Sequence, residues 1–205
     1  MIADSFFFLE FVVSYDYLHD AHRQVAAQAA SLIAGHHMKW VKAIAEVKAE
    51  TGIRPDDVLI ASEIRRWFAC FDHDAHQATL RRKRESALTV MQALREWHPT
   101  LIGHVLSGAA TEDTAVEILI QTEDEKGVEL TLLSLGISYD TLDIEAHGRQ
   151  SRISLLTECQ GENIILTITN ASNSVKSALP DEWQHPLEAR SKLDEKGLLT
   201  LLGED

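Results

Sequence analysis

The chain has 205 residues, of which 45% are hydrophobic and 25% are charged, and its formal net charge at pH 7 is −13. This length suffices for one or two domains with a real hydrophobic core, and the composition is that of an ordinary globular protein. Two cysteines in the whole chain exclude a disulfide-stapled scaffold and a paired-cysteine zinc site.

The negative charge is concentrated in the second half of the chain. Residues 1–98 carry 13 acidic and 12 basic side chains, whereas residues 99–205 carry 19 acidic and 7 basic ones. A surface as acidic as the second half repels polyanions, so the sequence disfavours nucleic acid as a partner.

The two cysteines and the N-terminal residues indicate the cellular compartment in which the protein is expected. Cys70 and Cys159 form no disulfide framework, which is typical of a reducing cytoplasm. The apolar run at residues 6–13 is interrupted by Glu10, follows Asp4 instead of basic residues, and is too short to span a bilayer. We therefore expect a buried helix or strand there, or residues upstream of the natural start, and we expect a cytoplasmic protein with no membrane partner.

The first third of the chain has helical periodicity. Apolar residues recur at three- and four-residue steps from Tyr17 to about Gly52, with an interruption near Gly35. A turn at residues 51–57 follows, and a further helix is expected from residue 58 to about residue 71. The sequence thus predicts a helical N-terminal region over residues 1–73.

A long amphipathic helix is predicted over residues 74–97. Asp74 and Gln77 have the spacing of a capping box, and His98-Pro99 ends the pattern. The basic run at residues 81–84 lies off the apolar stripe, so we expect a solvated face paired with the acidic second half; a phosphate or acidic partner is the alternative.

Short strands are predicted after Pro99, with a helix from about residue 123 to Gly136 and a last helix beginning near Pro186. The fold class is therefore α+β, a helical N-terminal region followed by a small mixed sheet with flanking helices over residues 74–205. The expected strands are residues 101–106, 116–122, 137–145, 152–159 and 163–169, the last two forming a hairpin.

A glycine turn lies between the first two predicted strands, at Gly108-Ala109. The order helix, strand, glycine turn, strand, helix, strand over residues 74–170 resembles the core of the nucleotidyltransferase superfamily, and the chain also resembles uncharacterised proteobacterial proteins of that type. In that superfamily, a Gly-Ser turn holds nucleotide phosphates and an Asp-x-Asp pair on the next strand holds Mg²⁺.

The resemblance assigns Gly108 to the glycine position, Ala109 to the serine position, and Ala115 and Glu117 to the two carboxylate positions. Because only Glu117 retains a carboxylate, we expect a catalytically degenerate member. One carboxylate rarely holds Mg²⁺, because the ion gives up its waters reluctantly.

Any metal site would thus need a second acid beside Glu117. The available acids on later strands are Asp140, Asp143 and Glu158, and the sequence does not select among them.

Three functions follow from this interpretation. The first is a degenerate nucleotidyltransferase-like protein that binds a small molecule or a protein partner. The second is an active Mg²⁺-dependent nucleotidyltransferase with an altered metal site at Glu117. The third is a scaffold that acts through helical homo-oligomerisation.

Overall fold

The computed structural model describes the backbone of residues 3–147, 150–170 and 181–203, and the side chains of residues 20–143, 152–170 and 181–203. The chain divides into two compact units, an N-terminal unit of Met1–Phe71 and a C-terminal unit of Asp72–Asp205. The fold class is α+β, as predicted. No helix among the described residues is both long enough and apolar enough to cross a membrane.

The N-terminal unit consists of helices. Helix α1 spans Ala3–His36, α2 spans Trp40–Thr51 and α3 spans Asp57–Phe71, and α1 contacts both of the others. The predicted break near Gly35 is confirmed, because α1 ends at His36. The predicted helix stop at Gly52 is also confirmed, because Gly52 caps α2 in the left-handed conformation. The apolar run at residues 6–13 belongs to α1, and its side chains lie outside the described residues.

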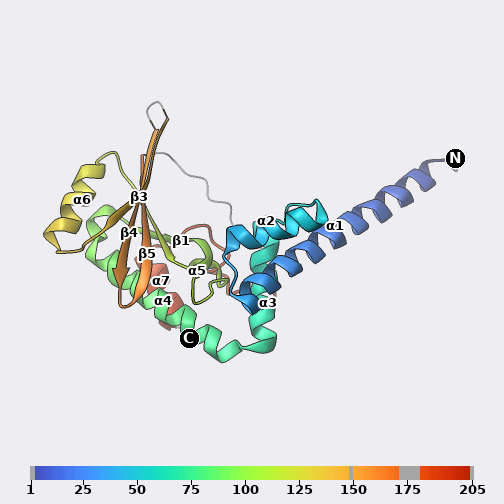
Figure 1. Ribbon diagram of the computed structural model, residues 1–205, viewed down its shortest axis with the longest axis horizontal. Coiled ribbons are helices and arrows are strands. Elements are labelled where there is room, and N and C mark those ends of the chain that lie inside the picture. The colour runs from blue at the N-terminus through green and yellow to red at the C-terminus, as the bar shows by residue number, and fades with distance from the viewer. Residues whose placement is uncertain (1–2, 148–149, 171–180, 204–205) are drawn as a thin grey trace. The chain divides into compact units, whose positions relative to one another are not determined.

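The C-terminal unit contains a five-stranded mixed sheet in the order β1-β2-β5-β4-β3. Strands β2 and β5 are parallel and every other neighbouring pair is antiparallel. The predicted hairpin of the last two strands is confirmed as β4 and β5 (Figure 1). The strand bounds are Thr100–Ile102 for β1, Val116–Gln121 for β2, Asp140–His147 for β3, Gln150–Cys159 for β4 and Glu162–Thr169 for β5.

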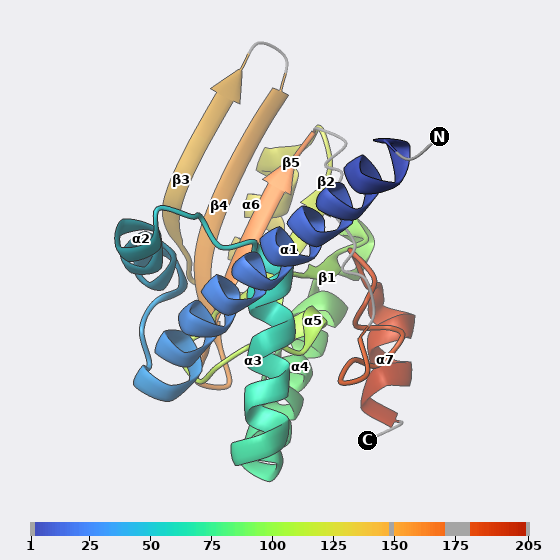
Figure 2. The same cartoon turned by 90° about the vertical axis from the view of Figure 1, so that its right-hand side faces the viewer.

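One face of the sheet forms the hydrophobic core together with helices. Alternate residues of β2 and β5 are buried in a single cluster with apolar residues of the helices α4, α6 and α7. Figure 2 shows α6 behind strands β4 and β5. The helix bounds are His73–Ala93 for α4, Gly103–Ser107 for α5, Glu125–Ser134 for α6 and Glu195–Gly203 for α7.

The start of α4 corrects one prediction. The helix begins at His73 with Asp72 as its N-cap, so Asp74 lies inside the first turn and is fully exposed. The predicted capping box of Asp74 and Gln77 is therefore wrong, since an Asp within the helix cannot cap its own start. The helix ends at Ala93 and continues as a single 3₁₀ turn over Arg95–Trp97.

The first predicted strand is also shorter than expected. Strand β1 ends at Ile102, and Gly103, with a φ of 73°, turns the chain directly into the short helix α5. A short apolar run such as residues 101–106 fits a strand and a buried helix equally well, which explains the error. The last helix begins at Glu195 and not near Pro186, because residues 181–194 form turns.

Candidate functional site

The glycine turn that lies beside Glu117 is formed by Gly103 and not by Gly108. Ile102, the last residue of β1, pairs with Glu117 on β2, so the following Gly103 lies against the glutamate side chain. A Cβ atom on Gly103 would overlap Glu117 Oε2 and would lie 2.8 Å from its Cδ. Glycine at this position therefore permits both the left-handed backbone and the close approach of the carboxyl group.

Glu117 has apolar neighbours on both adjacent strands. Ile102 faces it from β1 and Ile165 faces it from β5, in the same row of the sheet. Burial raises the pKa of the Glu117 carboxyl above its usual value, and the positive charge of Arg152 opposes this increase. Among the described residues, Glu117 has neither a hydrogen bond nor an ion pair.

The acids that were candidates for a shared metal site lie away from Glu117. Asp140 is in the same row but on β3, three strands away, which corresponds to about 14 Å at ordinary strand spacing. Asp143 is also on β3, and Glu158 is on β4, two strands away. The strand order separates these acids from Glu117, because β5, the last strand in sequence, inserts between β2 and β4.

Asp140 and Glu158 instead share an open hollow of about 390 Å³ with Asn163 and Tyr139. No group of three or more metal-ligating side chains occurs in the part of the chain that the structure describes. The expectation of a metal site that combines Glu117 with one of these acids is thus not met by the geometry.

Gly108 and Ala109 have a structural role in the C-terminal cap of α5. Gly108 adopts a φ of 75°, and the backbone N–H groups of both residues donate to the carbonyl oxygen of His104. Both residues are buried. These N–H groups are already bonded within the chain, and the role of Gly108 and Ala109 in holding nucleotide phosphates stays a prediction.

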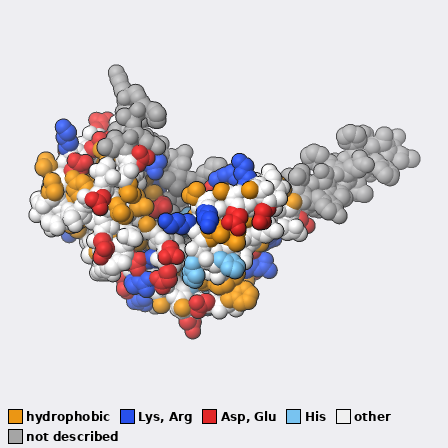
Figure 3. Space-filling model, viewed as in Figure 1, with side chains coloured by type: hydrophobic (Ala, Val, Ile, Leu, Met, Phe, Trp, Pro, Cys, Tyr) orange, Lys and Arg blue, Asp and Glu red, His pale blue; other side chains and the backbone are white. Residues whose placement is uncertain are grey.

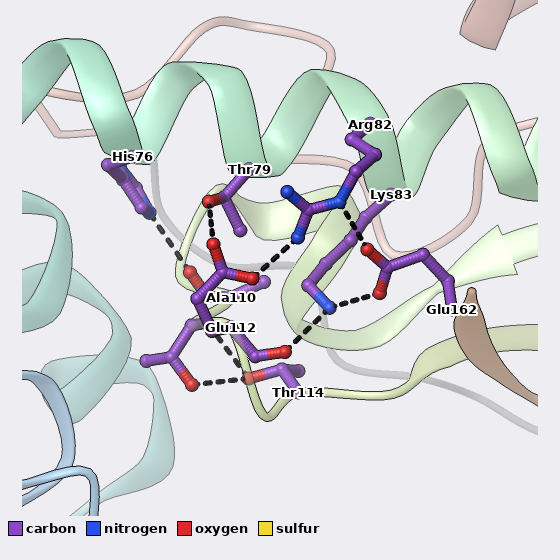
Figure 4. A network of polar contacts seen from close by, with 9 residues as sticks. His76, Thr79, Arg82, Lys83, Ala110, Glu112, Thr114 and Glu162 are labelled. Carbon is purple, nitrogen blue, oxygen red and sulfur yellow. Dashed lines mark hydrogen bonds and ion pairs between the residues drawn. The ribbon is translucent and has the colours of Figure 1, made fainter. Parts of the chain in front are cut away.

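The loop at residues 108–115 is fastened by one face of α4, as Figure 4 shows. Lys83 is only 1% exposed, and its Nζ donates to Glu162 Oε2 at 2.5 Å and to the Glu112 carbonyl at 2.9 Å. Arg82 donates to Glu162 Oε1 and to Glu112 Oε2, each at 2.5 Å. Two adjacent cations of α4 thereby connect the loop to the first residue of β5.

Two further residues of the same helix face bind this loop. His76 lies 3.0 Å from the Ala110 carbonyl through its Nε2, which donates in the neutral tautomer, and Thr79 donates to Glu112 Oε1 at 2.8 Å. Desolvation lowers the pKa of His76 to about 4, although the hydrogen bond with the Ala110 backbone opposes this decrease, so the ring is neutral at pH 7. The hydrogen bond from Thr79 and the charge of Arg82 lower the pKa of Glu112.

Arg84 forms a separate buried pair. Its guanidinium binds Glu188 and donates to the Val105 carbonyl at 3.2 Å, and the side chain is 1% exposed. Gly108 borders this pair, since a Cβ there would lie 3.0 Å from Glu188 Oε2. The pair attaches residues 181–194 to α4.

The prediction for the basic run is therefore confirmed in one respect and wrong in another. Arg82, Lys83 and Arg84 do pair with acids from the second half of the chain, but Lys83 and Arg84 are buried and not solvated. The sequence contained a signal for this arrangement, because His76, Thr79, Lys83 and Ser86 recur at three- and four-residue steps and form a buried polar stripe.

The comparisons with known proteins give no relative for this chain: no family model matches it, and neither the curated proteins nor the solved structures contain a match.

Proposed function

We propose that residues 74–205 form a nucleotidyltransferase-like unit that has lost metal-dependent transfer and acts by binding a ligand or a protein partner. The binding site is the corner of the sheet formed by Gly103 and Glu117. One observation carries the proposal: the glutamate that remains beside the glycine turn is isolated in apolar surroundings, with Ile102 and Ile165, and no second acid, opposite it on the two adjacent strands.

The order of elements supports the likeness to nucleotidyltransferases. Helix α4, strand β1, a glycine turn, strand β2, helix α6 and strand β3 come in the order that the resemblance implies, with the short helix α5 inserted between the glycine turn and β2. Strands β1 and β2 are antiparallel neighbours, so the turn and the following carboxylate meet at one corner. In this proposal Gly103 takes the position that the sequence alone assigned to Gly108.

The chemistry of the corner supports binding over transfer. Mg²⁺ in phosphoryl-transfer sites is held by carboxylates together with substrate phosphates, and its charge would lower the pKa of a ligating acid. Burial among apolar side chains acts in the opposite direction on Glu117 and favours its protonated form. Whether protonated or ionised, a carboxyl group can form a hydrogen bond with a polar ligand group without a metal ion.

Two cysteines without a disulfide between them accord with a reducing compartment, and we place the protein in the cytoplasm on that basis.

Thermal unfolding with the four common nucleoside triphosphates, with Mg²⁺ or with EDTA, tests the proposal. We expect that Mg²⁺ adds no stabilisation to any nucleotide. A ligand that uses the corner should stabilise the wild type in EDTA, and Glu117→Gln should change this effect. Glu158→Gln is the matched control, because it removes an exposed acid of the same sheet that lies two strands away.

The opposite result has a clear form. Mg²⁺-dependent stabilisation that disappears in Glu117→Gln and persists in Glu158→Gln would support the alternative, an active nucleotidyltransferase with an altered metal site, and would count against the proposed loss of the metal site. Nucleotide effects that are identical in all three proteins would remove nucleotides as ligands of the corner.

A further inference from the structure

A hollow of about 470 Å³ lies where three elements of the C-terminal unit meet: the 3₁₀ turn after α4, the start of β1 and the start of α7. Arg95 and His98 line it from the 3₁₀ turn, and Asp194, Glu195 and Lys196 line it from the beginning of α7. All five residues are at least partly exposed, so a small molecule can reach them. The C-terminal unit also exposes hydrophobic side chains over α6, at the left edge of Figure 3, but this hollow is lined mainly by charged ones.

Backbone hydrogen bonds hold the walls of the hollow in place. Leu101 in β1 and Leu193 exchange two N–H···O=C bonds, of 2.8 and 3.0 Å, and both side chains are buried in the core. The Asp194 side chain then accepts a hydrogen bond from the Gly197 N–H at 2.9 Å and caps the start of α7. The charged side chains therefore project from a backbone that is fixed without a ligand.

His98 occupies a backbone position that suits glycine. It ends the 3₁₀ turn with a φ of 49°, and its N–H donates to the Arg95 carbonyl at 3.2 Å. This left-handed conformation is strained for a residue with a Cβ atom, so glycine is the usual residue at such an end. Glycine would relieve the strain but would remove the imidazole from the hollow, which favours a role of the side chain in recognition.

Arg95, Glu195 and Lys196 carry charges that no described residue compensates. None of these three side chains has a hydrogen bond or an ion pair within the part of the chain that the structure describes. Arg95 and Glu195 line the same hollow and still do not pair with each other. Opposite charges that line one hollow without pairing are complementary to a ligand that carries both signs.

We infer that this hollow binds an α-amino acid in its zwitterionic form. Besides His98, two cationic side chains and two carboxylates line it, so their charges balance and favour neither a simple anion nor a simple cation. Arg95 and His98 can donate to the carboxylate of the ligand, and Glu195 can accept from its ammonium group. Leu199, which is 47% exposed, adds an apolar contact for the side chain of the amino acid.

Amide chemical shifts of the full chain, recorded as L-leucine is added at about 100 mM salt, test this inference. We expect shifts at residues 95–100 and 194–199 with a dissociation constant of about 1 mM or below. Two analogues of leucine are matched control ligands: isocaproate lacks the amino group and isoamylamine lacks the carboxylate. Each should bind at least about fivefold more weakly than L-leucine, because each leaves one sign of protein charge without a partner.

Two variants separate the charges of the hollow. Arg95→Gln should weaken L-leucine about fivefold or more and remove its advantage over isoamylamine, because the ligand carboxylate loses its cation. Glu195→Gln should weaken L-leucine similarly but remove its advantage over isocaproate. Arg190→Gln and Glu182→Gln, at exposed residues outside the hollow, are the matched controls and should change the affinity less than about twofold. Unchanged amide shifts away from each substitution show that the variants are folded.

Several results would overturn the inference. One is the absence of shifts around the hollow at about 10 mM L-leucine, roughly ten times the expected dissociation constant. Isocaproate or isoamylamine that binds as tightly as L-leucine would show that only one charge is recognised. Equal affinity of the wild type, Arg95→Gln and Glu195→Gln would place the ligand elsewhere. Glu117 does not line this hollow, so the inference and the proposed function fail independently.

Discussion

Two glutamates on neighbouring strands of the same sheet have opposite surroundings. Glu162, at the start of β5, is 6% exposed and binds Lys83 and Arg82 with both carboxylate oxygens at 2.5 Å. Glu117, on β2, lies between Ile102 and Ile165 and has no ion pair or hydrogen bond with any described residue. The first carboxylate is compensated by its environment, and the second is not.

The difference separates structural charge from candidate functional charge. A buried charge with well-placed partners is costly to break but contributes little beyond holding the elements together. Burial destabilises the ionised form of an acid and raises its pKa when no partner offsets the cost of desolvation. Such an acid marks a candidate functional site. By this criterion the polar face of α4 is a structural clamp and the corner at Gly103 is the candidate site.

The largest predicted effect is on the clamp. Lys83→Met leaves the buried Glu162 with one cation fewer and the Glu112 carbonyl without its donor, and we expect a loss of about 3–5 kcal/mol in the free energy of unfolding. Arg81→Met is the matched control in the same helix turn, since the pair that Arg81 forms with Glu85 is exposed; it should cost about 0–1 kcal/mol. Urea unfolding followed by circular dichroism measures both.

A second variant sharpens this test. Lys83→Met combined with Glu162→Leu replaces the buried pair with apolar side chains of similar volume and should recover much of the loss. If Lys83→Met lowers the free energy of unfolding no more than Arg81→Met does, then Lys83 does not stabilise the buried Glu162. The contrast between Glu162 and Glu117 then fails.

The next effect depends on pH and concerns His76. Its pKa is about 4 in the folded protein and 6.5 in the unfolded chain, so the unfolded state takes up the proton first as the pH falls. The stability that the neutral His76 contributes is fully present above pH 6.5. It decreases as the pH falls, and the loss reaches about 3 kcal/mol at pH 4. His76→Gln keeps an N–H donor for the Ala110 carbonyl but cannot titrate, so the wild type should lose more stability than this variant between pH 6.5 and pH 4.

Equal pH profiles for the wild type and His76→Gln would contradict the burial of a neutral histidine under the loop at residues 108–115.

The smallest structural effect is at the corner. Gly103→Ala combines a strained φ of 73° with overlap on Glu117 and should cost about 1–3 kcal/mol in stability. Gly136→Ala has nearly the same φ, 70°, with no atom near the new Cβ, so it reports the backbone strain alone at about 1 kcal/mol. The excess of the first over the second should vanish when Glu117→Ala is added. An excess that persists in the double variant would show that Gly103 is not packed on the glutamate.

Much of the fold could be predicted because its signals are local. Periodicity gave the helices of the N-terminal unit, and the turn at Gly161 gave the β4–β5 hairpin. Errors arose where local patterns are ambiguous: Val105 and Leu106 read as strand residues although they belong to a buried helical turn. The turn at Gly103 was missed because Gly108, another left-handed glycine, lies only five residues later.

The site was harder to predict because it depends on strand order. Periodicity indicates that Glu117 and Asp140 lie on strands, but it does not reveal that β5 separates them. The burial of Lys83 likewise depends on Glu162, a partner 79 residues away in sequence. A polar stripe on α4 was visible in the sequence, whereas the identity of its acidic partners was not.

We propose that Glu117 is an uncompensated acid that acts without a metal ion, and the titration of its carboxyl tests this proposal most directly. Carbon-13 NMR of the Glu117 carboxyl, assigned with Glu117→Gln, gives its pKa with and without millimolar Mg²⁺. We predict a pKa above the ordinary value of 4.5 that Mg²⁺ does not change; the contribution of Glu117 to stability is then fully present below pH 4.5 and is lost as the pH rises through the folded pKa. A pKa at or below 4.5, or one that falls when Mg²⁺ is added, would contradict the account.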